Sequence, residues 1–295
     1  MHPAPVGTGD RVVPVVRGRI KDLFKNLPLA MAGQEEAVHQ IRVASRRLRV
    51  TLPMAALKPK GQRVKRAVRR LKELTRVAGA SRDLDVALSL LPAAVPPQSA
   101  TPSARAALAR RLRAARSRAR RRMVESLLDF DIAGLRKDLG RIVERGGEDL
   151  FTALMRVRLM REEEGSALLA ELQRIGRRFD PEALHDVRSR VRRLRYAAEF
   201  SAALTGGPPK AARRFKEVQE LLGEMHDAWV LAQWLGRQAE LSAKRGREEE
   251  AAEARRLAAS CEDLSRKLHE KFLETNPAEI LQQALSLVGR SLSVA

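Results

Sequence analysis

The segment that decides the fold reads Val38-His39-Gln40-Ile41-Arg42-Val43-Ala44-Ser45-Arg46-Arg47-Leu48-Arg49, and it recurs as Leu184-His185-Asp186-Val187-Arg188-Ser189-Arg190-Val191-Arg192-Arg193-Leu194-Arg195. The copies share the pattern His-x-x-Arg-x-x-x-Arg-Arg-Leu-Arg, which chance rarely produces twice in one chain. Self-similarity at a long offset indicates repeated structural units. We therefore expect an internal duplication with similar halves, 11–145 and 150–292.

A second pair of matching stretches follows at nearly the same offset. The series Arg69…Lys72-Glu73…Gly79…Asp83 corresponds to Arg213…Lys216-Glu217…Gly223…Asp227. A weaker echo relates Ile132–Val143 to Ala278–Val288 near the end of each half. The halves differ at Arg76, whose counterpart is Glu220, so we expect an asymmetric pair rather than two identical units.

The composition predicts an all-α fold. Hydrophobic residues make up 44% of the 295 residues but aromatics only 3%, and the abundant Ala, Leu, Arg and Glu favour helices. Pro53 and Pro59-Lys60-Gly61 are expected to end the first His-containing helix, and Gly206–Pro209 the second. Pro92–Pro102 is expected to be a loop, and Asp180-Pro181 a helix start. Each half should then be an antiparallel bundle of four to six helices.

The charge balance indicates a polyanionic partner. The formal net charge is +21, which opposes compaction unless an anion neutralises it. Most of the bases are Arg, whose planar fork suits phosphate oxygens. The single Cys261 allows no internal disulfide and fits a reducing compartment. Without a membrane-spanning run or a signal-peptide core, we expect a cytoplasmic protein with no membrane partner.

On a helical wheel the repeated segment separates into a basic stripe and an apolar stripe. His39, Arg42, Arg46 and Arg49 fall within roughly 80° of arc, while Ile41 and the leucines after it share another face. The second copy repeats this arrangement with His185, Arg188, Arg192 and Arg195. Arg47 and Arg193 flank the stripes rather than joining them.

The next helix of each half carries a second basic stripe. Lys65, Arg69, Lys72 and Arg76 share one face in the first half, and Lys210, Arg213 and Lys216 share the corresponding face in the second. Like charges three or four residues apart repel by a few tenths of a kcal/mol per pair. Stripes made only of bases therefore point to a ligand that supplies negative charge.

Each of these features also has a plainer interpretation. The stripes could be solvated helix faces, although such faces usually mix signs. The histidines could serve as helix caps or core residues, but as switchable hydrogen-bond donors they suit phosphate. Asp83 and Asp227 are expected to cap helices beginning at Leu84 and Ala228. They could instead orient Arg82 or His226, and both roles are compatible.

Between Arg105 and Met123 lies another Arg-rich run that contains no acid. It has no clean counterpart in the second half, because the corresponding region, 247–269, mixes both signs. The run could be a solvated face or an auxiliary ligand contact, and the sequence does not separate the two.

The sequence offers little for catalysis. It contains no phosphate-binding loop of the Gly-x-x-x-x-Gly-Lys-Ser/Thr type, no His-x-x-x-His or Cys cluster for a metal, and no nucleophile elbow. We expect no cofactor, no metal site and no enzymatic activity. A phosphohistidine at His39 remains the enzymatic alternative.

These motifs make the chain similar to the CHAD family (conserved histidine α-helical domain). The resemblance rests on the two His/Arg segments, on Arg82-Asp83-Leu84-Asp85-Val86 and on Leu222-Gly223-x-x-His226-Asp227, and it spans nearly the whole chain. It implies two pseudo-symmetric helical bundles around a basic central groove or channel. It further implies binding of inorganic polyphosphate and association with polyphosphate granules. With no Glu-x-Glu-x-Lys signature of an attached triphosphate-tunnel domain, we expect a stand-alone CHAD protein.

The resemblance assigns a polyphosphate-binding role to residues that match the family's motifs, with Lys65 and Lys210 added from helical geometry. The main rival is a nucleic-acid-binding protein, but no aromatics for base stacking interleave with the stripes, so only weak non-specific binding of nucleic acid is expected. A polyphosphate-processing enzyme and a granule scaffold are further alternatives. The predicted site comprises His39, Arg42, Arg46, Arg47, Arg49, Lys65, Arg69, Lys72, Arg82, His185, Arg188, Arg192, Arg193, Arg195, Lys210, Arg213, Lys216 and His226.

Overall fold

The computed structural model describes residues 11–91 and 102–293, and all its regular elements in these ranges are helices. The all-α prediction is confirmed. One isolated β-bridge pairs Ala56 with Gly147. The helices are α1 (Val12–Met31), α2 (Glu35–Ala55), α3 (Gln62–Val77), α4 (Gly79–Leu90), α5 (Pro102–Leu128), α6 (Ile132–Glu144), α7 (Leu150–Ile175), α8 (Pro181–Thr205), α9 (Lys210–Ala243), α10 (Glu248–Glu274) and α11 (Pro277–Ser293).

Local sequence signals set several helix ends. Asp180 accepts a hydrogen bond from the Ala183 backbone N–H at 3.0 Å and caps α8, as predicted. Gly206 ends the same helix in the left-handed conformation, at φ 70°, where a side chain would be strained. Pro53 does not end α2, because the helix continues to Ala55. Of the predicted loop at 92–102, Pro102 opens α5 and the remainder lies outside the described residues.

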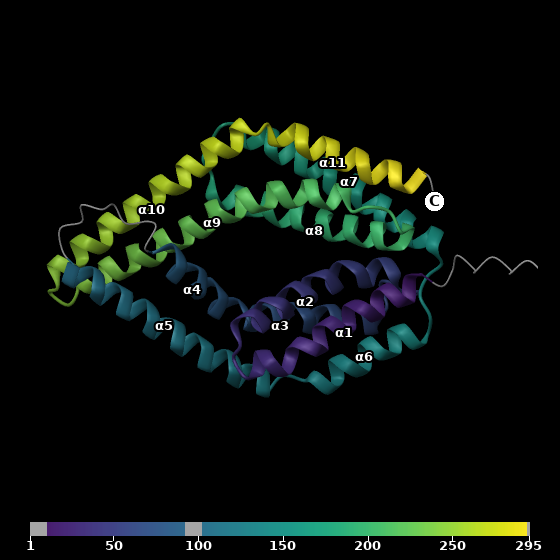
Figure 1. Ribbon diagram of the computed structural model, residues 1–295, viewed down its shortest axis with the longest axis horizontal. Coiled ribbons are helices and arrows are strands. Elements are labelled where there is room, and N and C mark those ends of the chain that lie inside the picture. The colour runs from purple at the N-terminus through teal and green to yellow at the C-terminus, as the bar shows by residue number, and fades with distance from the viewer. Residues whose placement is uncertain (1–10, 92–101, 294–295) are drawn as a thin grey trace, which may run out of the picture.

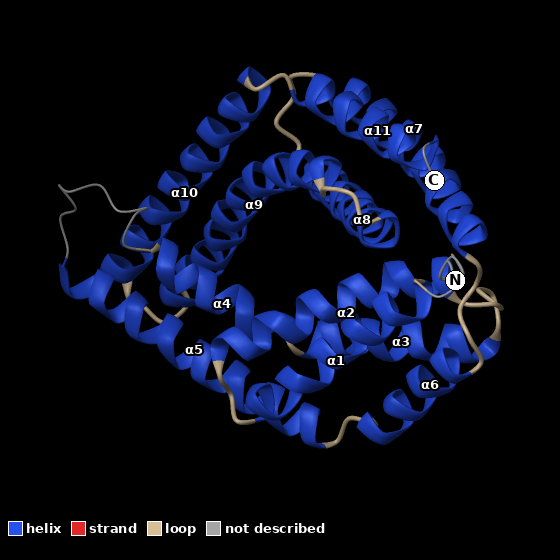
Figure 2. Ribbon diagram, turned by 45° about the vertical axis from the view of Figure 1, so that its right-hand side comes forward, coloured by secondary structure: helices blue, strands red, loops and turns tan. Residues whose placement is uncertain are grey.

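The helices form two groups that follow the chain. Figure 1 shows α1–α6 on one side of the molecule and α7–α11 on the other. The groups meet at one end, where α4 and α5 pack against the long α9–α10 hairpin. Figure 2 shows α5, α6, α7, α10 and α11 as an outer frame around the inner helices. The inner helices α2 and α8, which carry the repeated segments, pack on each other.

The apolar core runs through both groups. One buried cluster joins leucines and valines of α1, α2 and α3 to those of α7, α8, α9 and α11, with Ile41, Leu48, Val187 and Val191 among its members. A smaller cluster fills the junction of α4, α5, α9 and α10. The apolar stripes read from the sequence are thus buried, and their burial turns the basic stripes toward the space between the groups and toward solvent. None of the described helices is both long and apolar enough to cross a membrane.

Candidate functional site

Four arginines of the repeated segments gather where α2 meets α8. Burial, together with repulsion from Arg192, Arg42 and Arg188, lowers the pKa of Arg46 to about 9. Burial, together with repulsion from Arg188 and Arg42, lowers the pKa of Arg192 to about 10. Such repulsion requires the guanidinium groups to be close neighbours in a poorly solvated place. We call Arg42, Arg46, Arg188 and Arg192 the central quartet.

Two members of the central quartet are held by matching contacts. Arg42 donates a hydrogen bond to the carbonyl of Ala78 at 3.1 Å and lies 3.6 Å from the carboxylate of Asp83. Arg188 lies 4.0 Å from the carboxylate of Asp227. Each guanidinium also passes over a glycine, Arg42 over Gly79 and Arg188 over Gly223, where a Cβ would come within 3.4 and 3.2 Å. Equivalent residues of the two copies therefore make equivalent contacts.

Asp83 and Asp227 do not cap helices, contrary to the sequence prediction. Asp83 lies inside α4, which begins at Gly79, and Asp227 lies in the middle of α9. Gly223 does not interrupt α9, because tertiary packing on both sides outweighs the helix penalty of about 1 kcal/mol for one glycine. Both carboxylates instead partner quartet arginines, and burial raises the pKa of Asp227.

The other two members of the central quartet have no carboxylate partner among the described residues. Arg192 donates to the Ser189 hydroxyl at 3.0 Å, and no hydrogen bond or ion pair joins Arg46 to another described side chain. A largely buried guanidinium costs several kcal/mol to desolvate unless an anion compensates it. The quartet is therefore short of negative charge at Arg46 and Arg192.

Three histidines border the quartet. The rings of His185 and His226 lie 4.6 Å apart, at an interplanar angle of 41°. Burial, together with repulsion from Arg188, His185 and Arg192, lowers the pKa of His226 to about 4. Burial and neighbouring arginines also lower the pKa of His185 and of His39. All three imidazoles are thus neutral near pH 7 and can gain a proton when an anion arrives.

Other arginines of the repeated segments are paired with acids. Glu199 of α8 joins Arg47 at 2.8 Å and Arg195 at 3.0 Å, and so ties α2 to α8. Glu164 of α7 joins Arg193 at 2.7 Å. Burial and repulsion from Arg193 lower the pKa of Arg49. The sequence placed these arginines in the site, but it did not indicate their acidic partners.

A cavity of about 600 Å³ opens beside Glu199 between the two groups of helices. It holds predicted site residues from both halves, Arg47 and Arg195 with Arg213 and Lys216. It also holds Arg19 of α1, which the sequence analysis missed because α1 has no counterpart motif. The Arg19 guanidinium lies 5.4 Å from the Phe200 ring centre, and burial lowers its pKa to about 10.

The remaining predicted residues lie further out. Arg82 forms an ion pair with Glu35 at 3.2 Å, and Lys216 pairs with Glu220. The bases of the second stripes are exposed, and no contact among the described residues joins those of α3 to the central quartet. These are Lys65, Arg69 and Lys72 on α3 and Lys210, Arg213 and Lys216 on α9.

The Arg-rich run on α5 divides into two sets. Arg105 pairs with Glu253 and Arg111 with Glu250, which fastens α5 to α10, while Arg116 pairs with Asp85 and Glu35. The other set is exposed and comprises Arg110, Arg113, Arg118, Arg121 and Arg122. Part of the run is therefore structural, a role that sequence reasoning did not consider.

The described part of the chain holds no group of three or more His, Cys, Asp or Glu side chains arranged for a metal ion. Cys261 is buried, and burial raises the pKa of its thiol to about 11. Such a thiol stays protonated and reacts poorly.

Comparisons with known proteins agree with the helical architecture and with the paired motifs. The family model of the CHAD domain matches residues 15–236. A crystal structure of the CHAD domain from the plant Ricinus communis has a TM-score of 0.60 and 20% sequence identity, covering 98% of this chain and 92% of that one. At that identity the likeness shows the fold alone. No curated protein matches the chain. The family match extends over well more than half of the residues, and the chain belongs to the CHAD domain family.

Proposed function

We propose that this protein binds inorganic polyphosphate through the central quartet and the bases around it. The observation that carries the proposal is that no carboxylate of residues 11–91 and 102–293 pairs with Arg46 or Arg192, two largely buried arginines that repel each other. A phosphate chain would supply the missing charge, and guanidinium forks match its oxygens in bidentate geometry.

The surrounding groups suit a long, flexible anion. His39, His185 and His226 can donate further hydrogen bonds once protonated. The cavity beside Glu199, with Arg195, Arg213 and Lys216 in its walls, would let a chain continue from the α2–α8 contact onto α9. One long chain would then engage both halves, so long chains should bind more tightly than short ones.

The same features favour polyphosphate over nucleic acid. A single strand bound in a basic groove usually stacks its bases on aromatic side chains, and the aromatic ring closest to the quartet arginines in sequence, Tyr196, is buried. We further propose that the protein is a binder rather than an enzyme, and that it acts on polyphosphate granules in the cytoplasm. Release of phosphate from polyphosphate in the presence of Mg²⁺ would contradict the first of these statements.

The proposal is tested by calorimetric titration of the purified protein with long-chain polyphosphate near physiological salt, followed by competition with duplex DNA of matched charge. The quartet variant Arg46→Ala/Arg192→Ala is compared with the control Lys244→Ala/Arg245→Ala, which removes the same charge from the exposed α9–α10 turn. We expect the quartet variant to bind at least tenfold more weakly, and the control and the wild type to bind equally, with little displacement by DNA. Equal loss in both variants, or ready displacement by DNA, would show that general basicity explains the binding.

A further inference from the structure

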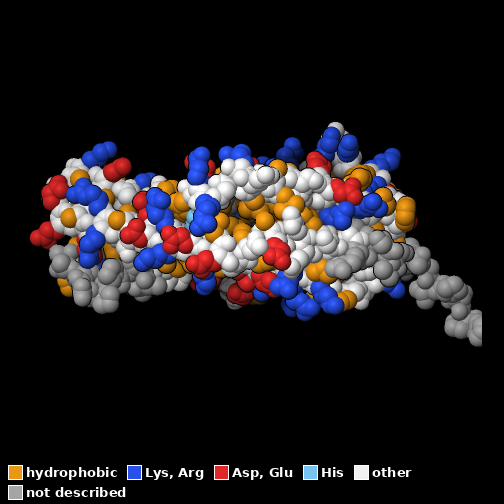
Figure 3. Space-filling view, turned by 90° about the horizontal axis from the view of Figure 1, so that it is seen from above, with side chains coloured by type: hydrophobic (Ala, Val, Ile, Leu, Met, Phe, Trp, Pro, Cys, Tyr) orange, Lys and Arg blue, Asp and Glu red, His pale blue; other side chains and the backbone are white. Residues whose placement is uncertain are grey.

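Almost all of the net positive charge of the chain comes from its first half. Residues 11–145 contain 32 Lys and Arg against 11 Asp and Glu, whereas residues 146–295 contain 25 against 24. Figure 3 shows basic and acidic side chains interspersed on the face seen from above. The central quartet draws equally on both halves, so it does not account for this asymmetry. The excess lies elsewhere in α1–α6.

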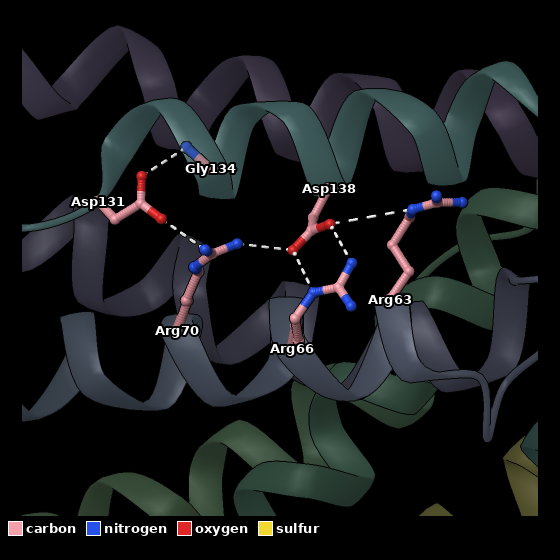
Figure 4. A network of polar contacts seen from close by, with 6 residues as sticks. All are labelled: Arg63, Arg66, Arg70, Asp131, Gly134 and Asp138. Carbon is pink, nitrogen blue, oxygen red and sulfur yellow. Dashed lines mark hydrogen bonds and ion pairs between the residues drawn. The ribbon is translucent and has the colours of Figure 1, made fainter.

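Part of that excess surrounds one buried carboxylate between α3 and α6. Asp138, whose side chain is 8% exposed, accepts hydrogen bonds from Arg66 at 3.0 Å and Arg70 at 2.6 Å. Arg70 also reaches Asp131, the cap of α6. The Nε of Arg63 lies 3.9 Å from the Asp138 carboxylate, which is too far for a hydrogen bond. This buried Nε has no hydrogen-bond partner among the described residues. Figure 4 shows the end of the Arg63 guanidinium extending past Asp138, away from Arg70.

The second half builds the corresponding helix contact without a buried carboxylate. When the similar sequences of α6 and α11 are aligned, Leu135 corresponds to Leu281 and Asp138 to Ala284. Leu135, Leu281 and Ala284 are apolar and completely buried. α9 and α11 pack together as α3 and α6 do. The helix pair therefore does not need a buried carboxylate ringed by arginines, and burying such charges is seldom stabilising. The network calls for a role other than packing.

A cavity of about 310 Å³ lies at the end of this network, at the lower limit of roughly 300–1,000 Å³ that is usual for ligand sites. Four cationic side chains line it, and its other walls are Gln62 and small or apolar residues, with Val64 and Ile142 among them. No Asp or Glu lines it. The cationic residues are Lys58, Arg63, Arg66 and Arg145.

The walls of this cavity are fixed by contacts outside it. The bridge between Ala56 and Gly147 joins the α2–α3 loop to the α6–α7 linker. The Arg156 guanidinium donates to the carbonyl of Ala56 at 2.8 Å and pairs with Glu148 at 2.6 Å. One wall is the first turn of α3, whose amide N–H groups add partial positive charge. A rigid, cation-lined cavity of this kind is preorganised for an anion.

We propose that the cavity between α3 and α6 is a second anion site, separate from the central quartet, which takes a short phosphate oxyanion such as phosphate, pyrophosphate or triphosphate. Arg63 and Arg145 would grip the oxygens, with Lys58 at the rim. Arg66 stays with Asp138, since its hydrogen bond there raises its pKa. The cavity is lined by no residue of the quartet, so the site stands even where the function proposed above fails.

The test uses the full chain carrying Arg46→Gln/Arg192→Gln, so that the quartet no longer contributes. Tripolyphosphate is titrated into this protein by calorimetry, with inorganic phosphate as a second ligand. We expect saturable binding of one tripolyphosphate per chain. Adding Lys58→Gln/Arg145→Gln, two exposed residues without an ion pair among the described side chains, should weaken that binding at least tenfold.

The control adds Arg113→Gln/Arg121→Gln on the exposed face of α5, which removes the same charge from the same half. Circular dichroism melting curves confirm that every variant is folded. An absence of tripolyphosphate binding in the quartet-less protein would overturn the proposal. An equal loss in the control would also overturn it, because the net charge of the half rather than the cavity would then explain the binding.

Discussion

Polyphosphate binding should strengthen as the pH falls, because binding returns a proton to His226. In the free protein, burial and repulsion from Arg188, His185 and Arg192 lower the pKa of His226 from 6.5 to about 4. Within α9, the charged residue next to His226 is Asp227. A bound phosphate chain neutralises the arginines and accepts a hydrogen bond from the imidazolium, so the pKa of His226 should rise toward 6.5 in the complex.

The size of the effect follows from proton linkage. A group whose pKa rises from about 4 to about 6.5 on binding increases the affinity about thirtyfold between pH 8 and pH 5, which is about 2 kcal/mol. Solvent screening at a partly exposed ring makes this an upper bound. Free-protein stability changes in the opposite direction: the folded-state pKa lies below the unfolded value, so the free protein loses stability as pH falls from about 6.5 toward 4.

Calorimetry at pH 5, 6, 7 and 8, in buffers of different ionisation enthalpy, measures both affinity and proton uptake. The variant His226→Gln keeps a hydrogen-bonding side chain but cannot titrate. We expect wild type to take up protons on binding near pH 6 and to show the steeper pH dependence. If the two proteins show the same pH dependence, His226 does not gain a proton and the placement of phosphate beside it is wrong.

Three further predictions concern contacts on which the reasoning depends. Asp138→Ala should lower the free energy of unfolding by about 2–3 kcal/mol in urea titrations, because it removes the hydrogen bonds that Arg66 and Arg70 donate to a buried carboxylate; a loss below 1 kcal/mol would show that the network is not essential. Gly223→Ala should not lower the melting temperature, since Ala is the better helix former, yet it should weaken polyphosphate binding severalfold, because the new Cβ lies 3.2 Å from the Arg188 guanidinium. Parallel loss of stability and binding would contradict this. Arg46→Ala/Arg192→Ala should reduce the slope of log K against log salt by about 1.4, at about 0.7 per lost phosphate contact; an unchanged slope would mean that neither arginine meets phosphate.

The sequence predicted what helical periodicity controls. The apolar stripes of the repeated segments are buried. The basic stripes lie on the remaining faces of the same helices, and those faces gather at the α2–α8 contact. Spacing and the repeat placed Arg42 with Arg46, and Arg188 with Arg192, on one face of each helix, and the family resemblance implied that the two faces form one site. The division into halves at 145–150 and the function remain predictions.

The sequence did not predict contacts that depend on how distant helices meet. Glu199 lies four residues after Arg195, so that pair was within reach of helical spacing, but its contact with Arg47 depends on the crossing of α2 and α8. Asp83 and Asp227 were expected to cap helices beginning at Leu84 and Ala228, because Asp is a favoured N-cap residue. Tertiary packing keeps α9 helical through Gly223, and no local feature of the sequence indicates this continuation.

The balance of charge in the central quartet sets a limit on how the protein can use it. Two carboxylates, Asp83 and Asp227, offset two of four arginines, which lets α2 and α8 approach at all. A carboxylate for Arg46 and another for Arg192 would stabilise the free protein further, but each would compete with phosphate for the same guanidinium fork. The free state is therefore left with repulsion, and under the proposed function a bound polyanion would relieve it and gain affinity by doing so. On this view the quartet stabilises the fold least where it binds the ligand best, which is the relation expected of a binding site rather than of a structural ion-pair network.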